Sequence, residues 1–176
     1  MKIKKAIRKC VKIIGKGLRF VICFFLRLST LGSKSGKHIT RYYMYEHLSW
    51  VLKSISNCST GNKMLSISGS EDICNLVGIK DPQIIEVNFP EYSMLKLPFK
   101  DGEFDWVVTG QVLEHVEGNP QQAIDESYRL LKPGGIAIHT TCFIMPIHRS
   151  PNDFWRFTPE ALQLLCNKFT KILDMG

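Results

Sequence analysis

The sequence predicts an α/β fold, an open sheet of mostly parallel strands with flanking helices. Short apolar segments of strand length alternate with longer segments in which apolar residues recur every three or four positions. Strands that are separated by helices pair in parallel, because each helix returns the chain to the same end of the sheet. The chain has 176 residues, 44% of them hydrophobic, and is therefore long enough to bury one sizeable core.

Each expected element has a local reason. Helices are expected where apolar residues recur at helical spacing without an internal breaker, and strands where short apolar runs follow turn-forming residues. In chain order, the expected elements are helix 42–55, turn 57–62, strand 63–68, helix 71–76, strand 83–87, strand 105–109, helix 120–131, strand 135–140, a helix from 158 and a strand beginning within 169–173.

Two element boundaries have clear chemical signals. Thr158 is a preferred N-cap residue, and Pro159 follows it at the first position of a helix. Residues 132–135 (KPGG) are expected to end the preceding helix and to turn the chain into the fourth strand.

Positive charge is concentrated at the N-terminal end. Residues 1–41 hold 12 of the 23 Lys and Arg residues and no acidic residue, so the remainder holds 11 basic and all 16 acidic residues, a net charge of −5. An acidic body argues against nucleic acid as the partner of this protein. The six cysteines form no CxxC pair, and no metal site is expected; this usage fits a reducing cytoplasm.

Residues 1–30 are expected to form a basic amphipathic leader, residues 31–41 a linker, and residues 42–176 the α/β domain. The longest uncharged apolar run of the leader, 20–26, has seven residues, whereas a membrane-spanning helix needs about 20. Residues 1–28 could therefore lie on an anionic membrane surface, pack on the domain itself, or act as a signal or nucleic-acid arm. The first alternative would place a cytoplasmic protein peripherally at the membrane.

Candidate binding residues follow the expected strands. Ligands of an open parallel sheet bind at the carboxyl ends of the strands, near the point where the strand order reverses. These ends correspond to residues 66–70, 86–88, 110–111 and 139–142. Gly69 would let backbone N–H groups approach a ligand closely, although a strand-to-helix turn without a ligand could also contain it.

Two blocks lie at the centre of this region, LPFKDGEFDWVVTGQVLEHV (97–116) and ESYRLLKPGG (126–135). They resemble the class I S-adenosylmethionine-dependent methyltransferases of the type 11 methyltransferase-like family. A third block, HRSPNDFWRFTPEAL (148–162), is similar to a bacterial subgroup linked with surface-polysaccharide pathways. The resemblance implies a Rossmann-like sheet, shortened relative to the family, C-terminally incomplete and preceded by a basic N-terminal helix.

The resemblance also implies a cofactor, S-adenosyl-L-methionine, and the residues that contact it. The expected cofactor-binding residues are Ser66, Ser68, Gly69, Glu86, Asn88, Leu97, Gln111 and Val112. Leu97 has an alternative as a core residue, and His115 is expected to be a structural hydrogen-bonding residue. Two positions depart from the family pattern, because Ser66 and Ser93 stand where acidic residues are usual. Each lost charge-assisted hydrogen bond would weaken cofactor binding by roughly 1.5–3 kcal/mol.

The loop after the fourth strand is expected to form the substrate side. His148 would receive or orient the proton of the acceptor, and Asp153, Trp155 and Arg156 would contact the substrate. In the alternative interpretation, Asp153 and Arg156 pair to fix the loop and Trp155 is a packing anchor.

The predicted function is methyl transfer to a small-molecule acceptor, with a saccharide or lipid of a surface-polysaccharide pathway as the finer expectation. The alternative is a catalytically inactive methyltransferase-like module that binds ligands or acts as a scaffold at the membrane surface. Ser66 and Ser93 favour this alternative, whereas the intact blocks 97–105 and 113–116 favour the enzyme.

Overall fold

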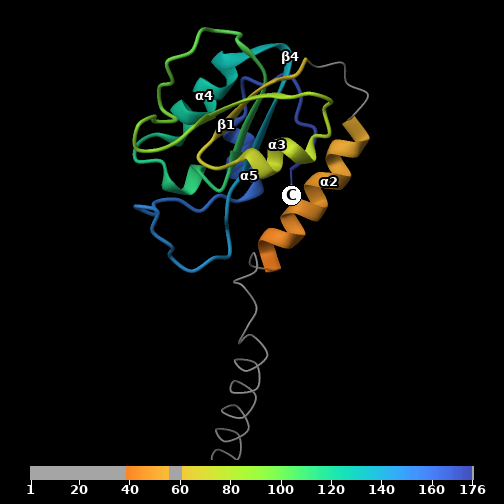
Figure 1. The fold of residues 1–176 in the computed structure, drawn as a ribbon. Coiled ribbons are helices and arrows are strands. Elements are labelled where there is room, and N and C mark those ends of the chain that lie inside the picture. Colours follow the sequence, from red (N-terminus) through yellow and green to blue (C-terminus); the bar gives the residue numbers. More distant parts are fainter. Residues whose placement is uncertain (1–38, 56–60, 176) are drawn as a thin grey trace, which may run out of the picture. The chain divides into compact units, whose positions relative to one another are not determined.

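The computed structural model describes residues 39–55 and 61–175 (Figure 1). It separates into residues 1–42 and residues 43–176, and the fold described here is that of the second part. The expected leader, most of the linker and most of turn 57–62 lie outside the described residues. None of the helices in the described ranges is both long and apolar enough to cross a membrane.

Four parallel strands form one sheet in the described part of the chain. They are β1 (Lys63–Ile67), β2 (Gln83–Val87), β3 (Phe104–Gly110) and β4 (Leu131–Thr140). The strand order is β2-β1-β3-β4, so the chain builds outward in one direction from β1 and in the other from β3. The order therefore reverses between β1 and β3, which is the switch point of the sheet. This topology confirms the predicted Rossmann-like α/β fold.

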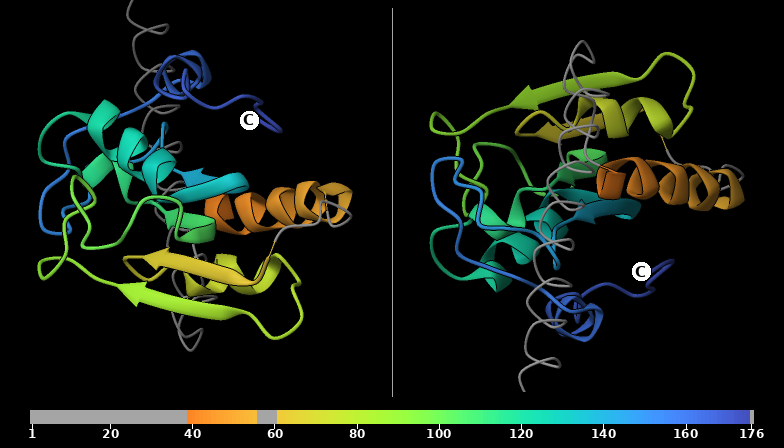
Figure 2. Two further views of the ribbon diagram at one scale, coloured as in Figure 1. Left: turned by 90° about the horizontal axis from the view of Figure 1, so that it is seen from above. Right: turned by 90° about the horizontal axis from the view of Figure 1, so that it is seen from below.

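The helices cover both faces of the sheet (Figure 2). They are α2 (Ile39–Ile55), α3 (Glu71–Leu76), the short 3₁₀ helix η1 (Leu113–His115), α4 (Pro120–Leu130) and α5 (Pro159–Leu165).

Alternating side chains of the strands build two separate hydrophobic cores. Met64 of β1 and Val108 of β3 are fully buried on the face that α2 and α3 cover. Leu65 and Val107, their neighbours in sequence, are fully buried on the opposite face against α4, with α5 packed at the border of that core. Strand residues alternate between the two faces of a sheet, so a short, almost entirely apolar strand serves both cores.

The expected helix starts are present. Asn119 caps α4 by accepting a hydrogen bond from the backbone N of Gln121, and Thr158 caps α5 by accepting one from the backbone N of Ala161. A proline follows each cap at the first helical position, where its missing N–H leaves no hydrogen bond unmade.

Two predicted boundaries were wrong by more than one residue, and one predicted strand is absent from the described residues. The first helix begins at Ile39, so it includes the end of the expected linker. β4 begins at Leu131, because residues 132–135 continue the strand through a register shift opposite residues 104–106 instead of forming a separate turn. No strand forms at 169–173. Phe169 instead packs edge-on against Tyr128 of α4, with ring centroids 5.3 Å apart, so its burial requires no strand pairing.

Candidate active site

A sharp turn at the carboxyl end of β1 forms one side of the switch point. Ser68 and Gly69 both have left-handed backbone conformations, with φ of 55° and 76°. The backbone N of Ser68 donates to the carbonyl oxygen of Val87 at 2.8 Å, and the backbone N of Gly69 donates to Oε1 of Glu86 at 2.7 Å. A Cβ atom at Gly69 would have no heavy atom within 4 Å, so the turn borders open space. The turn and Glu86 therefore form one polar unit across the ends of β1 and β2.

The other side of the switch point lies at the end of β3. The buried hydroxyl of Ser70 donates to the carbonyl oxygen of Ile67 at 2.6 Å and accepts from the backbone N of Gly110 at 2.7 Å, which joins the two strand ends. Gln111 follows with φ of 61°, and its backbone N donates to the carbonyl oxygen of Thr140 at 2.9 Å. A non-glycine residue in this conformation is often found at functional sites.

The structure thus brings Ser68, Gly69, Glu86 and Gln111 to one edge of the sheet. Ser66 lies in β1, where its side chain is fully buried and its hydroxyl has no hydrogen-bond partner among the described residues. Its contact with a cofactor stays a prediction.

The remaining expected cofactor residues lie outside the turn itself. The side chain of Leu97 is buried in the core, and its backbone N donates to Oε1 of Glu126 at 2.7 Å, as in the packing alternative. Val112 packs partly buried against the same core. Asn88 is exposed after β2, and Ser93 uses its hydroxyl to accept from the backbone N of Leu95 at 3.3 Å. Cofactor contacts by Leu97, Val112 and Asn88 also stay predictions.

The loop after β4 is built around a buried carboxylate. Asp153 has a side chain that is only 1% exposed, and both of its oxygens pair with the guanidinium of Arg156. Its Oδ2 also accepts from the backbone N of His148 at 2.8 Å. The Arg156 guanidinium, followed by this backbone hydrogen bond, holds the pKa of Asp153 well below its usual range. The predicted Asp153–Arg156 pair is therefore confirmed, and it fixes the loop that carries His148.

Trp155 is anchored in the same loop. Its indole Nε1 donates to the carbonyl oxygen of Val116 at 2.9 Å, and its ring stacks on Phe157 with centroids 6.2 Å apart. The backbone N atoms of Phe154 and Trp155 both donate to the carbonyl oxygen of Glu114. These contacts agree with a packing role, and the predicted substrate contacts of Asp153, Trp155 and Arg156 stay predictions.

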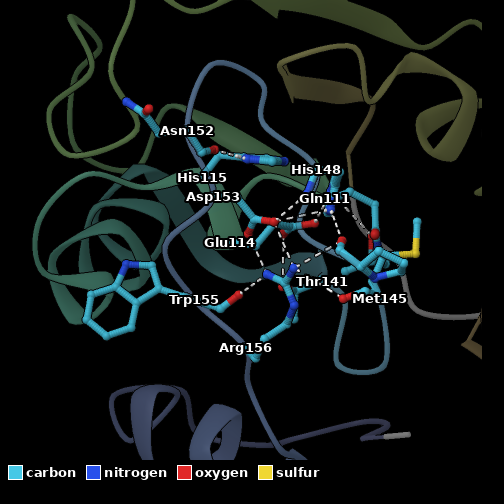
Figure 3. A network of polar contacts seen from close by, with 12 residues as sticks. Gln111, Glu114, His115, Thr141, Met145, His148, Asn152, Asp153, Trp155 and Arg156 are labelled. Carbon is cyan, nitrogen blue, oxygen red and sulfur yellow. Dashed lines mark hydrogen bonds and ion pairs between the residues drawn. The ribbon is translucent and has the colours of Figure 1, made fainter.

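Sequence reasoning did not identify Glu114 as a functional residue and expected His115 to be only structural. Figure 3 shows both beside His148, at the carboxyl edge of β3 and β4. The rings of His115 and His148 meet edge to face, with centroids 5.0 Å apart. No local pattern signals this buried carboxylate, because Glu114 lies between Leu113 and His115 and glutamate is rarely fully buried.

The parallel sheet, with a left-handed glycine turn and an acidic residue at its switch point, makes this chain an open α/β domain, a class whose ligands bind at that place. Residues 48–139, just over half of the chain, match the family described as "Methyltransferase domain", type 11. The chain belongs to this methyltransferase-domain family.

Two curated proteins share shorter segments with this chain. An uncharacterized methyltransferase of Schizosaccharomyces pombe is 44% identical over 57 residues, which are 32% of this chain and 20% of that protein. An uncharacterized protein of Methanocaldococcus jannaschii is 54% identical over 39 residues, 22% of this chain and 18% of that one. The matched segments span about one fifth of each relative.

Solved structures with a similar arrangement include methyltransferases. A Thermotoga maritima S-adenosylmethionine-dependent methyltransferase aligns over 74% of this chain and 76% of its own, with 16% identity and a TM-score of 0.40. The methyltransferase in the Haloferax volcanii complex with the Trm112 activator aligns over 72% and 70%, with 13% identity and a TM-score of 0.46.

Membership in the family implies S-adenosylmethionine as the methyl donor. The residues at the switch point fit this group. A carboxylate such as Glu86 can accept hydrogen bonds from ribose hydroxyls, and the open space beside Gly69 lets a ligand approach the backbone. Ser66 stands where the family pattern has an acidic residue, and it supplies no negative charge. Glu86 is therefore the proposed carboxylate of this site.

Proposed function

We propose that this protein transfers a methyl group from S-adenosylmethionine to a small acceptor, with the cofactor held at the switch point by residues 68–70 and Glu86. The contact between Glu86 Oε1 and Gly69 N, beside open space, is the observation that carries the proposal. Both residues lie within the segment that matches the family. Gln111 and Val112 would extend the site from the end of β3.

In this reaction the main task of the protein is to position the methyl donor and the acceptor. The bound cofactor supplies a methyl group on a positively charged sulfur; the S–C bond breaks as the acceptor nucleophile forms its own bond to carbon. The nucleophile loses its proton to a nearby base or to water. Alignment of the two reactants can supply much of the rate enhancement of such a transfer. His148, at the edge formed by the loop after β4, is proposed to receive or orient the acceptor's proton.

The experiment is calorimetric titration of the full chain with S-adenosylmethionine, comparing Glu86→Gln with Glu91→Gln. Glutamine at position 86 can still accept from Gly69 but no longer presents a charge to ribose hydroxyls, so affinity should fall about tenfold or more. Glu91 is an exposed acid further along the same loop and serves as the matched control. Equal affinity of Glu86→Gln and the wild type would contradict the proposed role of Glu86.

The finer proposal concerns the acceptor and the location. We propose that the acceptor is a saccharide or lipid, which the similarity of residues 148–162 to the polysaccharide-linked subgroup supports. We also propose that the protein is cytoplasmic and is attached peripherally to an anionic membrane by residues 1–28. The alternation of basic and apolar residues in that segment supports the attachment.

A second candidate is a catalytically inactive binding module, which serine at positions 66 and 93 favours. An inactive module that has lost the cofactor site would show no heat of binding at millimolar S-adenosylmethionine while remaining folded.

A further inference from the structure

Three potential ligand groups converge at the carboxyl edge of β3 and β4 (Figure 3). Glu114 and His115 come from η1, directly after β3, and His148 comes from the loop after β4. One ligand atom from each residue lies within 4.8 Å of the others. One ion contacts three such atoms when they lie at most about 4.4 Å apart, because metal–ligand bonds to histidine and carboxylate are about 2.0–2.2 Å long. Binding would therefore draw these three side chains slightly closer together.

The Glu114 carboxylate is buried, and one of its two oxygens has no hydrogen-bond donor among the described residues. Its side chain is fully buried, and Oε2 accepts a hydrogen bond from the hydroxyl of Thr141 at 2.9 Å. Oε1 has no hydrogen-bond partner among the described residues and lies 3.9 Å from Nε2 of His148. A buried carboxylate oxygen without a partner is strongly unfavourable, so a cation at this position would explain its retention.

Arg156 interacts electrostatically with Glu114 but forms its side-chain hydrogen bonds elsewhere. The Arg156 guanidinium is already engaged by both oxygens of Asp153.

Each of the two imidazoles has its Nδ1 beside a backbone carbonyl oxygen. Nδ1 of His115 lies at hydrogen-bonding distance from the carbonyl oxygen of Asn152, and Nδ1 of His148 lies 3.2 Å from the carbonyl oxygen of Pro146 and 3.4 Å from Oδ2 of Asp153. A carbonyl oxygen can only accept, so Nδ1 carries the proton in each ring. Nε2 then keeps its lone pair for a metal, as in histidine ligands generally.

We propose that Glu114, His115 and His148 bind a divalent first-row transition-metal ion. Two imidazoles and one carboxylate suit such ions, including Zn²⁺, Mn²⁺, Fe²⁺ and Co²⁺, whereas Mg²⁺ and Ca²⁺ prefer sites made of oxygen ligands. Three protein ligands leave coordination positions open. If the proposed methyl transfer holds, an acceptor oxygen would fill one of them, and the ion would promote loss of its proton. His148 would then orient the acceptor's proton through the ion that it holds and not as a free base.

The test titrates the untagged, EDTA-treated full chain with CoCl₂ alone, followed by calorimetry and visible absorption. The proposal predicts one Co²⁺ per chain, visible bands of a site with nitrogen and oxygen ligands, and a higher unfolding temperature with the ion. His115→Ala and His148→Ala should each lower the affinity at least about tenfold. His47→Ala, which removes an imidazole of α2 that pairs with Asp174, should leave binding unchanged.

Several results would overturn the proposal. These are the absence of Co²⁺ binding, an affinity equal to that of the wild type in both histidine variants, or an intense thiolate-to-cobalt band that assigns the ion to cysteine. Glu114→Gln provides a separate check, since its unfolding temperature should no longer rise with Co²⁺. If Glu114→Gln does not fold, His148→Ala decides the test, because the side chain of His148 is 35% exposed and its replacement disturbs the core less. The titration uses no S-adenosylmethionine, so its failure is distinguishable from failure of the proposed methyl transfer.

Discussion

His139 is a histidine of β4 that is held in its neutral form. Nδ1 lies 2.8 Å from the hydroxyl of Thr109, and Nε2 is buried with no partner among the described residues. Burial lowers its pKa from 6.5 to about 4. Between these values the unfolded chain binds a proton that the folded chain does not, so the free energy of unfolding should fall as the pH decreases from 6.5 towards 4.

His139→Asn tests this linkage, because asparagine can keep the hydrogen bond to Thr109 without titrating. Relative to the variant, the wild type should lose about 2 kcal/mol of its free energy of unfolding between neutral pH and about pH 5. Urea denaturation of both proteins at the two pH values measures the difference. Parallel pH dependences of wild type and variant would show that His139 is not buried in neutral form.

Sequence reasoning reached some site residues and missed others for a physical reason. Asp153 and Arg156 are three positions apart, so local spacing predicted their pairing. The approach of His148 to Glu114 and His115 depends on how the loop after β4 folds back onto η1, and no local pattern encodes that distance.

At the scale of elements, the loop over residues 141–158 depends on one carboxylate. Asp153→Ala leaves the guanidinium of Arg156 and the backbone N of His148 without their acceptor. We expect a clear drop in the urea midpoint and faster proteolysis within this loop, because breaking a buried pair leaves an uncompensated charge.

Asp125→Ala is the matched control for this prediction. Asp125 pairs with Lys168, whose side chain is 51% exposed, and such surface pairs contribute at most about 1 kcal/mol. Both variants are measured in EDTA, so that metal binding does not contribute. Equal shifts in the two variants would mean that the Asp153–Arg156 pair does not hold the loop.

Elements with a local chemical signal were predicted well. The N-cap of α5 and the alternation of strands and helices could be predicted from residues that are neighbours in the sequence. The strand expected at 169–173 was wrong because apolar composition alone cannot say whether a run pairs with a sheet or packs on a helix; Phe169 packs on Tyr128. The strand order β2-β1-β3-β4 depends on contacts between segments that are distant in the sequence. The positions of the strands along the chain therefore did not predict this order.

For the whole molecule, the contrast between a basic N-terminal segment and an acidic remainder predicts reversible membrane attachment. The full chain should sediment with anionic vesicles and dissociate as salt rises, since each basic residue near the surface contributes about 1 kcal/mol. Replacing both Phe24 and Phe25 by serine should weaken attachment even at low salt. Equal binding to neutral and anionic vesicles would exclude this electrostatic mechanism.

The central claim is that the switch point binds S-adenosylmethionine, and a calorimetric titration of Gly69→Val against Gly134→Val tests it most directly. Both glycines have left-handed conformations and no heavy atom within 4 Å of a Cβ, so valine strains the backbone similarly at each. Gly134 lies in β4, near its start, at the other end of that strand from the switch point. We predict that wild type and Gly134→Val bind the cofactor and that folded Gly69→Val does not, because its side chain fills the ligand's space. Undiminished binding by Gly69→Val, or no binding by folded wild type at millimolar cofactor, would contradict the account.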